Sequence, residues 1–208
     1  MKYKELTKNR MNRYPLYLKY LILKKNANQH TISPTDIAFD LKISKESVRK
    51  DFQVISSENG VPKVGRKVDH LIRDIENFLG YHKKTKAIVI GVGNLGKAIL
   101  SYKGFDNYGI EIVAAFDLST KLIGKSINDI QIHSIDKIKD FKNVEVAIIC
   151  VPKENAQETA DLVVSCGIKA IYNFSPIYLV VDDDVIVETV DIASSIAYLS
   201  AKKRLKGE

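Results

Sequence analysis

Gly91, Gly93 and Gly96 stand in a G-x-G-x-x-G pattern between a β-branched apolar run and a helix-like segment. In that setting the first glycine permits a tight turn, the second lets backbone approach a pyrophosphate, and the third lets the helix pack closely on the strand. The amides that open the helix would face the same anion. The pattern therefore predicts a dinucleotide-binding loop, and the alternative is a structural turn without a ligand. The expected contacts are Gly91, Val92, Gly93, Asn94, Leu95 and Gly96.

Asp117 ends the apolar segment 111–117, at 21 positions after Gly96. This is the position at which dinucleotide-binding folds place a carboxylate that accepts hydrogen bonds from ribose hydroxyls. A carboxylate also repels a 2′-phosphate, and residues 118–120 contain no arginine that could bind one. We therefore expect NAD(H) rather than NADP(H), although Lys121 leaves NADP(H) open.

The segments after Asp117 alternate between strand-like and helix-like patterns. Strands are expected at 130–133, 144–151, 169–173 and 185–190, and helices near 135–139 and 153–165. Such alternation predicts an α/β Rossmann domain with a doubly wound parallel sheet. Ligands bind such sheets at the carboxyl ends of the strands, so we expect Val151, Pro152 and Asn173 to border the cofactor as well.

Basic residues are concentrated in the first part of the chain. Residues 1–84 contain 18 Lys and Arg against 9 Asp and Glu, whereas residues 85–208 contain 14 against 16. A nucleic-acid-binding module fused to a near-neutral effector module would show this asymmetry, because phosphate contacts require cations. A general enrichment in surface lysine is the alternative.

The N-terminal segment has the pattern of a winged helix-turn-helix. Helices are expected at 13–25, at 34–41 with Ser33 as cap, and at 45–55 with Ser44 as cap. The third would be the recognition helix, residues 56–68 a basic wing, and 69–79 a closing helix. A helical hairpin that binds nothing is the alternative. The expected DNA contacts from this pattern are Lys45, Ser47, Arg49, Lys50, Lys63, Arg66 and Lys67.

A small NAD-dependent oxidoreductase is the rival interpretation, because most domains with this glycine pattern serve hydride transfer. Tyr198 and Lys202 have the Tyr-x-x-x-Lys spacing of short-chain dehydrogenases. With ten tyrosines and many lysines in the chain, however, one such pair is expected by chance. The pair also follows all the strands, and little chain remains for a substrate domain. We therefore expect no catalytic residues and no enzyme.

Neither metal nor membrane binding is indicated. The two cysteines are too few for a tetrahedral site, and the four histidines do not cluster. Cys150 is expected to be a buried strand thiol, with a thiol switch as the alternative. No apolar run of membrane-spanning length or signal peptide is present, so we expect a cytoplasmic protein.

Taken together, the two halves resemble the Rex family of NADH-responsive repressors of Gram-positive bacteria, and the likeness covers nearly the whole chain. The stretches that resemble the family, in order, are RYPLYLKYL (13–21), SVRKDF (47–52), VGRKV (64–68), GVGNLG (91–96), IVAAFD (112–117), AIICVP (147–152), NFSP (173–176) and VDI (190–192).

The resemblance implies a homodimer that exchanges its last helix, about 191–204, and binds a double-stranded inverted-repeat operator. NADH would favour a closed, DNA-incompetent arrangement. Arg49 and Lys50 match recognition-helix contacts. Arg13, also expected to contact DNA, matches with Tyr102 and Asp191 a polar set that links DNA binding to the nicotinamide site, which makes Tyr102 a cofactor contact. From the patterns alone, packing of the last helix on its own sheet remained equally possible.

Two departures from the family stand out. Residues 55–63 replace an aromatic, glycine-rich stretch with paired arginines, and the last helix ends in Lys202-Lys203-Arg204 instead of aromatic residues. The chain could therefore be a diverged paralogue with an altered operator or effector response. The expected organisation is a winged-helix domain at 1–80, a Rossmann domain at 81–190 and a dimerisation helix at 191–208.

Overall fold

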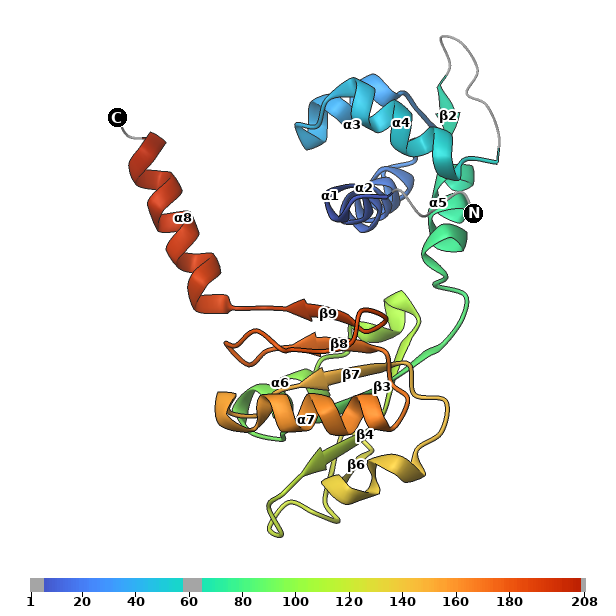
Figure 1. Cartoon of the computed structure of the whole chain (residues 1–208). Coiled ribbons are helices and arrows are strands. Elements are labelled where there is room, and N and C mark those ends of the chain that lie inside the picture. Colours follow the sequence, from blue (N-terminus) through green and yellow to red (C-terminus); the bar gives the residue numbers. More distant parts are fainter. Residues whose placement is uncertain (1–5, 58–64, 207–208) are drawn as a thin grey trace. The chain divides into compact units, whose positions relative to one another are not determined.

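The computed structural model describes residues 6–57 and 65–206 and divides into two units, Met1–Lys83 and Lys84–Glu208 (Figure 1). Each unit has its own apolar core. Because the placement of the units relative to each other is not determined, each is described by itself.

The first unit is built mainly from helices. Its helices are α1 (Lys8–Met11), α2 (Arg13–Asn26), α3 (Pro34–Leu41), α4 (Lys45–Ile55) and α5 (Val68–Leu79). All except α1 were predicted, and α1 is a single turn, too short for an apolar period to reveal it. The core of the unit includes Tyr14, Tyr17, Leu21, Ile37, Val48, Phe52, Leu71 and Ile75.

Side-chain caps start α3 and α4 where the sequence predicted them. Ser33 Oγ accepts a hydrogen bond from the Asp36 amide at 3.2 Å, and Asp36 Oδ2 accepts from the Ser33 amide at 3.0 Å. Ser44 Oγ accepts from the Ser47 amide at 3.1 Å. Between the helices, Lys42 takes a left-handed conformation with φ of 54°. These local bonds confirm the predicted helix-turn-helix.

Substitution of Ser33 by alanine should destabilise the first unit by about 1 kcal/mol, because the amides of the first turn of α3 lose their acceptor. The measurement is urea unfolding of the full chain, followed by far-UV circular dichroism. Thr35→Ala, two positions further along the chain and exposed, is the matched control and should leave the midpoint nearly unchanged. Equal shifts for both variants would contradict a capping role.

A two-stranded ribbon closes the first unit. β1 (Thr31–Ile32) pairs antiparallel with β2 (Arg66–Lys67). Gly65, with φ of +91°, is required there because a Cβ would lie 2.5 Å from the Ile32 carbonyl oxygen. β1 was not predicted, since two residues show no alternation and the strand depends on partners 34 and 36 positions away. Most of the predicted wing, including Lys63, lies outside the described residues.

The second unit contains a seven-stranded sheet in the order β5-β6-β4-β3-β7-β8-β9. The chain runs outward from β3 in both directions, which places the topological switch point between β3 and β7. All neighbours pair in parallel, as predicted, except at one edge, where β5, a strand that was not predicted, pairs antiparallel with β6. The strands are β3 (Thr85–Ile90), β4 (Ile110–Asp117), β5 (Ser126–Ile127), β6 (Ile130–Ser134), β7 (Val146–Ile149), β8 (Ala170–Asn173) and β9 (Ile186–Thr189).

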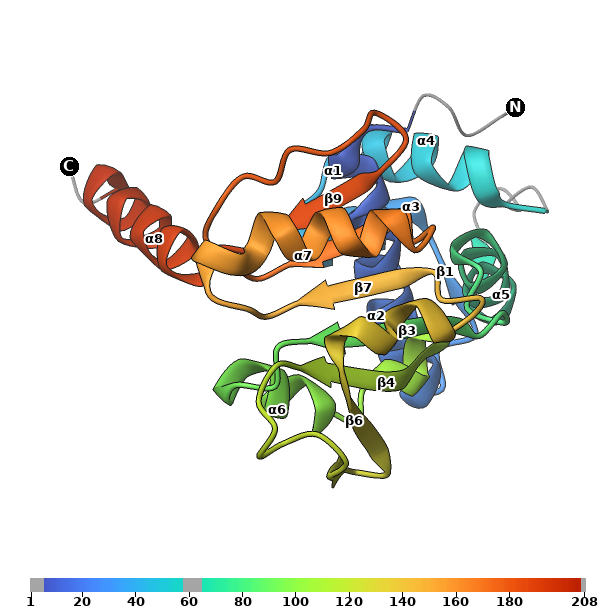
Figure 2. The same cartoon turned by 60° about the horizontal axis from the view of Figure 1, so that its bottom comes forward.

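Helices cover both faces of this sheet. α7 (Lys153–Ser165) shares a core cluster with Ile88 and Ile90 of β3, whereas α6 (Asn94–Leu100) shares a different cluster with Val89. Because successive side chains of a strand point to opposite faces, the two helices lie on opposite sides. Figure 2 shows α7 lying along the strands of its face. The sheet is therefore doubly wound, as predicted.

Two short helices of the second unit differ from the expectation. Residues 135–139 form a 3₁₀-helix, η2 (Ile135–Asp140), and a further 3₁₀-helix, η1 (Phe105–Tyr108), was not predicted. The described residues 174–185, between β8 and β9, form no helix.

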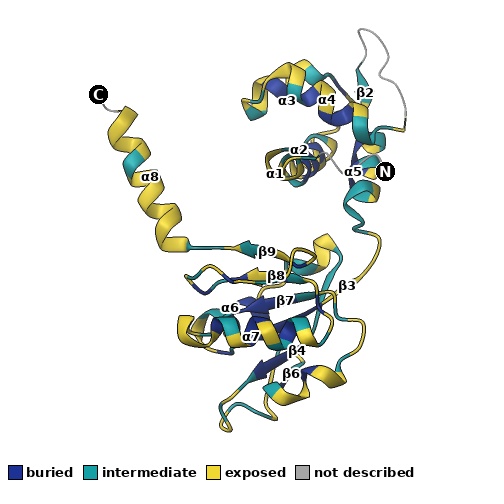
Figure 3. Cartoon of the chain, viewed as in Figure 1, coloured by how far each residue is buried: buried dark blue, intermediate teal, exposed yellow. Residues whose placement is uncertain are grey.

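The last helix, α8 (Ile192–Lys206), has no buried residue among those described, and Ile196 and Leu199 are each 62% exposed. Figure 3 shows its surface as mostly exposed. Its apolar side chains therefore do not pack on their own sheet.

Candidate functional site

A cavity of about 420 Å³ lies at the carboxyl ends of β3, β4 and β7, beside the switch point of the sheet. This is where open α/β sheets bind their ligands. Its lining residues are Ile90, Gly91, Gly93, Asp117, Leu118, Ile135, Cys150, Val151, Pro152, Asn155 and Thr159.

The three glycines have the three geometries that the pattern predicts. Gly91 has φ of +90°, and a Cβ there would lie 2.8 Å from the Cys150 carbonyl group. A Cβ on Gly96 would lie 2.0 Å from the Gly91 carbonyl oxygen, so helix and strand approach too closely for any side chain. A Cβ on Gly93, by contrast, would meet nothing within 4 Å. Backbone at Gly93 is therefore open to a ligand in the cavity.

Asp117 is tied to the glycine turn. Its Oδ2 accepts a hydrogen bond from the Val92 amide at 2.6 Å, and its Oδ1 accepts from the Ser119 amide at 2.8 Å. Each oxygen keeps further acceptor capacity, because an ionised carboxylate has about four lone-pair sites. The two amides thus orient the carboxylate at the edge of the cavity, where it can accept from ligand hydroxyls.

The other predicted cofactor residues differ in their placement. Val151 and Pro152 line the cavity as expected. Asn94 and Leu95 open α6, and Val92 is fully buried against the α6 face of the sheet, so its side chain points away from the cavity.

Asn173 is fully buried and bonded within its own loop. Its Nδ2 donates to the carbonyls of Ser175 and Ile177 and to Thr189 Oγ1, while its Oδ1 accepts from the Ser175 amide. These bonds indicate that Asn173 shapes the loop after β8.

Cys150, expected inside a buried strand, lies one residue past the end of β7 and is half-buried at the cavity wall. Burial raises the pKa of its thiol to about 12. Since the thiolate is the reactive form, this environment disfavours a thiol switch.

Sequence reasoning missed the wall formed by α7. Asn155 and Thr159 lie about one turn apart in the first half of this helix, and both line the cavity. Their spacing of four places them on one helix face, which was a usable pattern. Leu118 and Ile135 complete the side next to Asp117.

Tyr102 and Asp191 lie outside the cavity lining. The Tyr102 ring is 60% exposed and stacks edge-on against Phe105, with ring centroids 5.2 Å apart. Asp191 Oδ1 accepts from the Ser194 amide at 3.0 Å and so caps the first turn of α8.

The recognition helix α4 has a sharply divided surface. Lys45, Arg49 and Lys50 are exposed, and Ser47 is half-buried, whereas Val48 and Phe52 are buried in the core of the unit. Lys50 also forms an ion pair with Glu46 at 3.6 Å. The exposed face thus presents cations that can meet phosphates and base edges. From the ribbon, Lys67 adds an exposed cation and Arg66 is half-buried.

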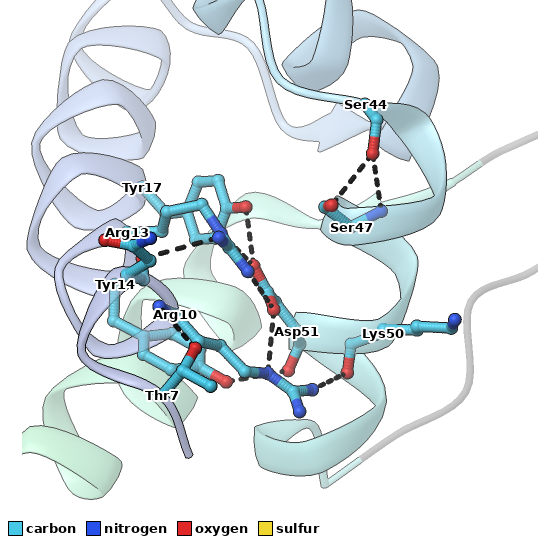
Figure 4. A network of polar contacts seen from close by, with 10 residues as sticks. Thr7, Arg10, Arg13, Tyr14, Tyr17, Ser44, Ser47, Lys50 and Asp51 are labelled. Atoms are coloured by element: carbon cyan, nitrogen blue, oxygen red, sulfur yellow. Dashed lines mark hydrogen bonds and ion pairs between the residues drawn. The ribbon is translucent and has the colours of Figure 1, made fainter.

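An ionic network that the sequence did not reveal fixes the inner side of α4. Asp51 is 1% exposed and accepts hydrogen bonds from Arg10, Arg13 and Tyr17 (Figure 4). The three donors precede Asp51 by 34 to 41 positions in the sequence, so no local pattern links them to it.

Among the described residues, no cluster of three or more His, Cys, Asp or Glu is placed to hold a metal ion, and no helix is long and apolar enough to cross a membrane.

A helix-turn-helix unit followed by a doubly wound sheet with a glycine-lined cavity defines the class of protein, a DNA-binding regulator with a nucleotide-type effector site. Comparisons with known proteins agree with this class. Residues 6–53 match a family described as "Putative DNA-binding protein N-terminus", and residues 82–177 match the CoA binding domain family.

Full-length relatives narrow the class to one family. The chain is 42% identical to the redox-sensing transcriptional repressor Rex of Treponema denticola, covering 94% of each chain, and 36% identical to that of Thermoanaerobacter sp. strain X514, covering 95% and 92%. The crystal structure of RSP with NAD⁺ and operator DNA superposes with a TM-score of 0.89 at 33% identity, covering 97% of each chain. The crystal structure of RSP with NADH superposes with a TM-score of 0.87 at 31% identity, covering 98% of this chain and 97% of the RSP chain. The chain belongs to the Rex family of redox-sensing transcriptional repressors.

Proposed function

We propose that this chain represses transcription by binding operator DNA through its first unit and that NADH, bound in the second unit, releases it. The observation that supports this most directly is the cavity beside Gly93 and Asp117, joined in one chain to a helix-turn-helix. RSP, similar over nearly its whole length, has been crystallised with NAD⁺ and operator DNA and with NADH.

The residues around the cavity fit a dinucleotide. The open backbone at Gly93 and the amides of α6 would receive the pyrophosphate, and Asp117 would accept from ribose hydroxyls. Leu118 and Ile135 supply apolar wall next to Asp117. The proposed cofactor contacts are residues 91–96, Asp117, Val151, Pro152, Tyr102 and Asn173, the last acting through the loop that it shapes.

DNA contacts are proposed from the exposed face of α4, with Lys45, Ser47, Arg49 and Lys50, and from the ribbon, with Arg66 and Lys67. Lys63, outside the described residues, remains a prediction.

The mostly exposed α8, which has no buried residue among those described, supports a dimer in which this helix packs on a second subunit, because an apolar stripe left in water costs free energy. A symmetric dimer would read an inverted repeat. NADH can release DNA only if it binds the DNA-incompetent state more tightly than the competent one. The set Arg13, Tyr102 and Asp191 remains a prediction for the link between sites.

Operator release tests this function. Fluorescence anisotropy of a labelled inverted-repeat duplex, selected by the wild-type protein from a random pool, should fall as NADH is added at fixed NAD⁺. In Asp117→Ala the NADH needed should rise roughly tenfold or more, since a hydrogen bond to a charged group contributes about 1.5–3 kcal/mol. Asp183→Ala, an exposed carboxylate in the loop before β9, is the control. DNA binding insensitive to any NADH:NAD⁺ ratio would contradict the sensor function.

The relatives are named as repressors, and we propose that the chain is not an enzyme and acts in the cytoplasm. The oxidoreductase alternative predicts loss of NADH absorbance with some carbonyl substrate. We expect a flat trace across a panel of aldehydes and ketones.

A further inference from the structure

The inner side of α4 holds a carboxylate that is almost completely buried. Asp51, 1% exposed, follows Lys50 directly and lies between the buried residues Val48 and Phe52 of the same helix. Burial of a charge is costly unless it is paired and hydrogen-bonded. The side chains that pair with Asp51 are therefore needed inside the first unit.

Arg13, at the start of α2, is the most fully engaged partner. Its Nε donates to Asp51 Oδ2 at 2.6 Å and its Nη2 to Oδ1 at 2.9 Å, a two-pronged arginine-carboxylate pair. Its Nη1 donates to the Asn9 carbonyl at 3.3 Å. The hydrogen bonds that Arg13 donates to Asp51 raise the pKa of its guanidinium. All three nitrogens of the Arg13 guanidinium therefore donate hydrogen bonds within the first unit.

Arg10 joins α1 to two points on α4. Its Nε donates to Asp51 Oδ1 at 2.8 Å, and its Nη2 donates to the Lys50 carbonyl oxygen (Figure 4). Tyr17 donates to Asp51 Oδ2 at 2.8 Å, and Tyr14 donates to the Asp51 carbonyl at 3.1 Å. Four side chains from α1 and α2 therefore converge on two consecutive residues of α4.

These hydrogen bonds constrain the rotation of α4 about its own axis more closely than apolar packing does. Contacts of Val48 and Phe52 keep the apolar face of α4 against the core and so set the rotation of the helix about its axis coarsely, but these contacts are non-directional and do not fix its exact value. The two-pronged pair and the carbonyl contacts are directional. Lys50, whose side chain is exposed, and its neighbour Asp51 lie on the same turn. The rotation that the network sets is therefore the rotation at which Arg49 and Lys50 face outward.

We infer that Arg13 and Arg10 are positioning residues: they act on DNA recognition through Asp51, by setting the rotation of α4, and not by contacting phosphate. This inference rests on the proposed binding of operator DNA by α4. It assigns to Arg13 a role other than the direct contact expected from the sequence.

The two roles of Arg13 predict different measurements. Loss of a phosphate contact weakens binding to every sequence alike and lowers the slope of log affinity against log salt concentration by about one. Loss of a positioning residue leaves the phosphate-contacting groups in place but misdirects the base-reading ones. It therefore lowers the ratio of operator to non-specific affinity and leaves the salt slope on non-specific DNA unchanged.

The experiment uses the full chain with NAD⁺, the selected inverted-repeat duplex and a scrambled duplex of equal length, at several salt concentrations. The variants are Asp51→Asn, which keeps the shape of the side chain, Arg13→Lys, which keeps the charge, and the double variant. We expect both single variants to lose roughly tenfold or more in operator affinity, consistent with about 1–3 kcal/mol for a misplaced base contact. Affinity for the scrambled duplex and its salt slope should stay within error.

The double variant should lose little more than either single variant, because both remove the same pair. Thermal unfolding followed by circular dichroism verifies that the first unit of each variant is folded. Arg73→Lys, an exposed arginine on α5, controls for the substitution itself and should leave both affinities unchanged.

Three results would overturn the inference. One comes from a further variant, Arg13→Ala, which removes the charge: a salt slope on the scrambled duplex lowered by about one, while Asp51→Asn binds operator normally. Another is additive losses in the double variant. The third applies if Asp51→Asn is unfolded: an Arg13→Lys variant whose ratio of operator affinity to scrambled-duplex affinity equals that of the wild type. By contrast, a wild-type protein that shows no preference for any duplex would mean that the proposed function itself has failed, and the inference with it.

Discussion

Gly96→Ala should abolish dinucleotide binding and destabilise the second unit. A Cβ at this position would lie 2.0 Å from the Gly91 carbonyl oxygen, and the obstructing atom is backbone that cannot swing aside. Overpacking typically costs about 1–3 kcal/mol, and we expect at least the upper value here. Thermal unfolding of the full chain with and without NADH measures both effects, with a lowered midpoint and no stabilisation by the ligand.

Gly93→Ala is the matched control, because it adds the same methyl group three positions earlier in the same glycine pattern. A Cβ at Gly93 meets nothing within 4 Å, so the variant should unfold like the wild type. It should still bind NADH more weakly, since the methyl group would stand beside the cavity where backbone is open. Equal thermal midpoints for Gly96→Ala and wild type would refute the close approach of helix and strand.

Arg49→Ala should remove most operator affinity and leave NADH binding unchanged. Arg49 is exposed on the outer face of α4, while the core contacts of the helix come from Val48 and Phe52. A side chain that reads a base edge contributes about 1–3 kcal/mol, which corresponds to roughly 5- to 150-fold in affinity. Anisotropy titration of operator DNA and calorimetric titration of NADH provide the two measurements.

Arg73→Ala, which removes an exposed arginine from α5, separates recognition from general charge. If both variants lose operator affinity equally, binding depends on net charge rather than on the face of α4. If Arg49→Ala also loses NADH binding, the substitution has disturbed folding.

Features set by neighbouring residues were predictable. Ser33 and Ser44 cap helices through bonds to amides three positions away, and the glycine pattern specifies its own turn. The strands around the cavity were found to within a few residues, because buried parallel strands form continuous apolar runs. Strand β1 was not predicted, because a two-residue strand exists only through its pairing with β2.

The sequence by itself therefore determined the two modules, the glycine turn and the acid at Asp117, since each depends on spacing within one segment. Only the tertiary structure decided the use of Asn173 within its own loop and the commitment of Arg13 to the buried Asp51. The physical reason is that a polar side chain takes its role from the partner that satisfies it. For Arg13 that partner lies 38 positions away, where no local pattern can indicate it.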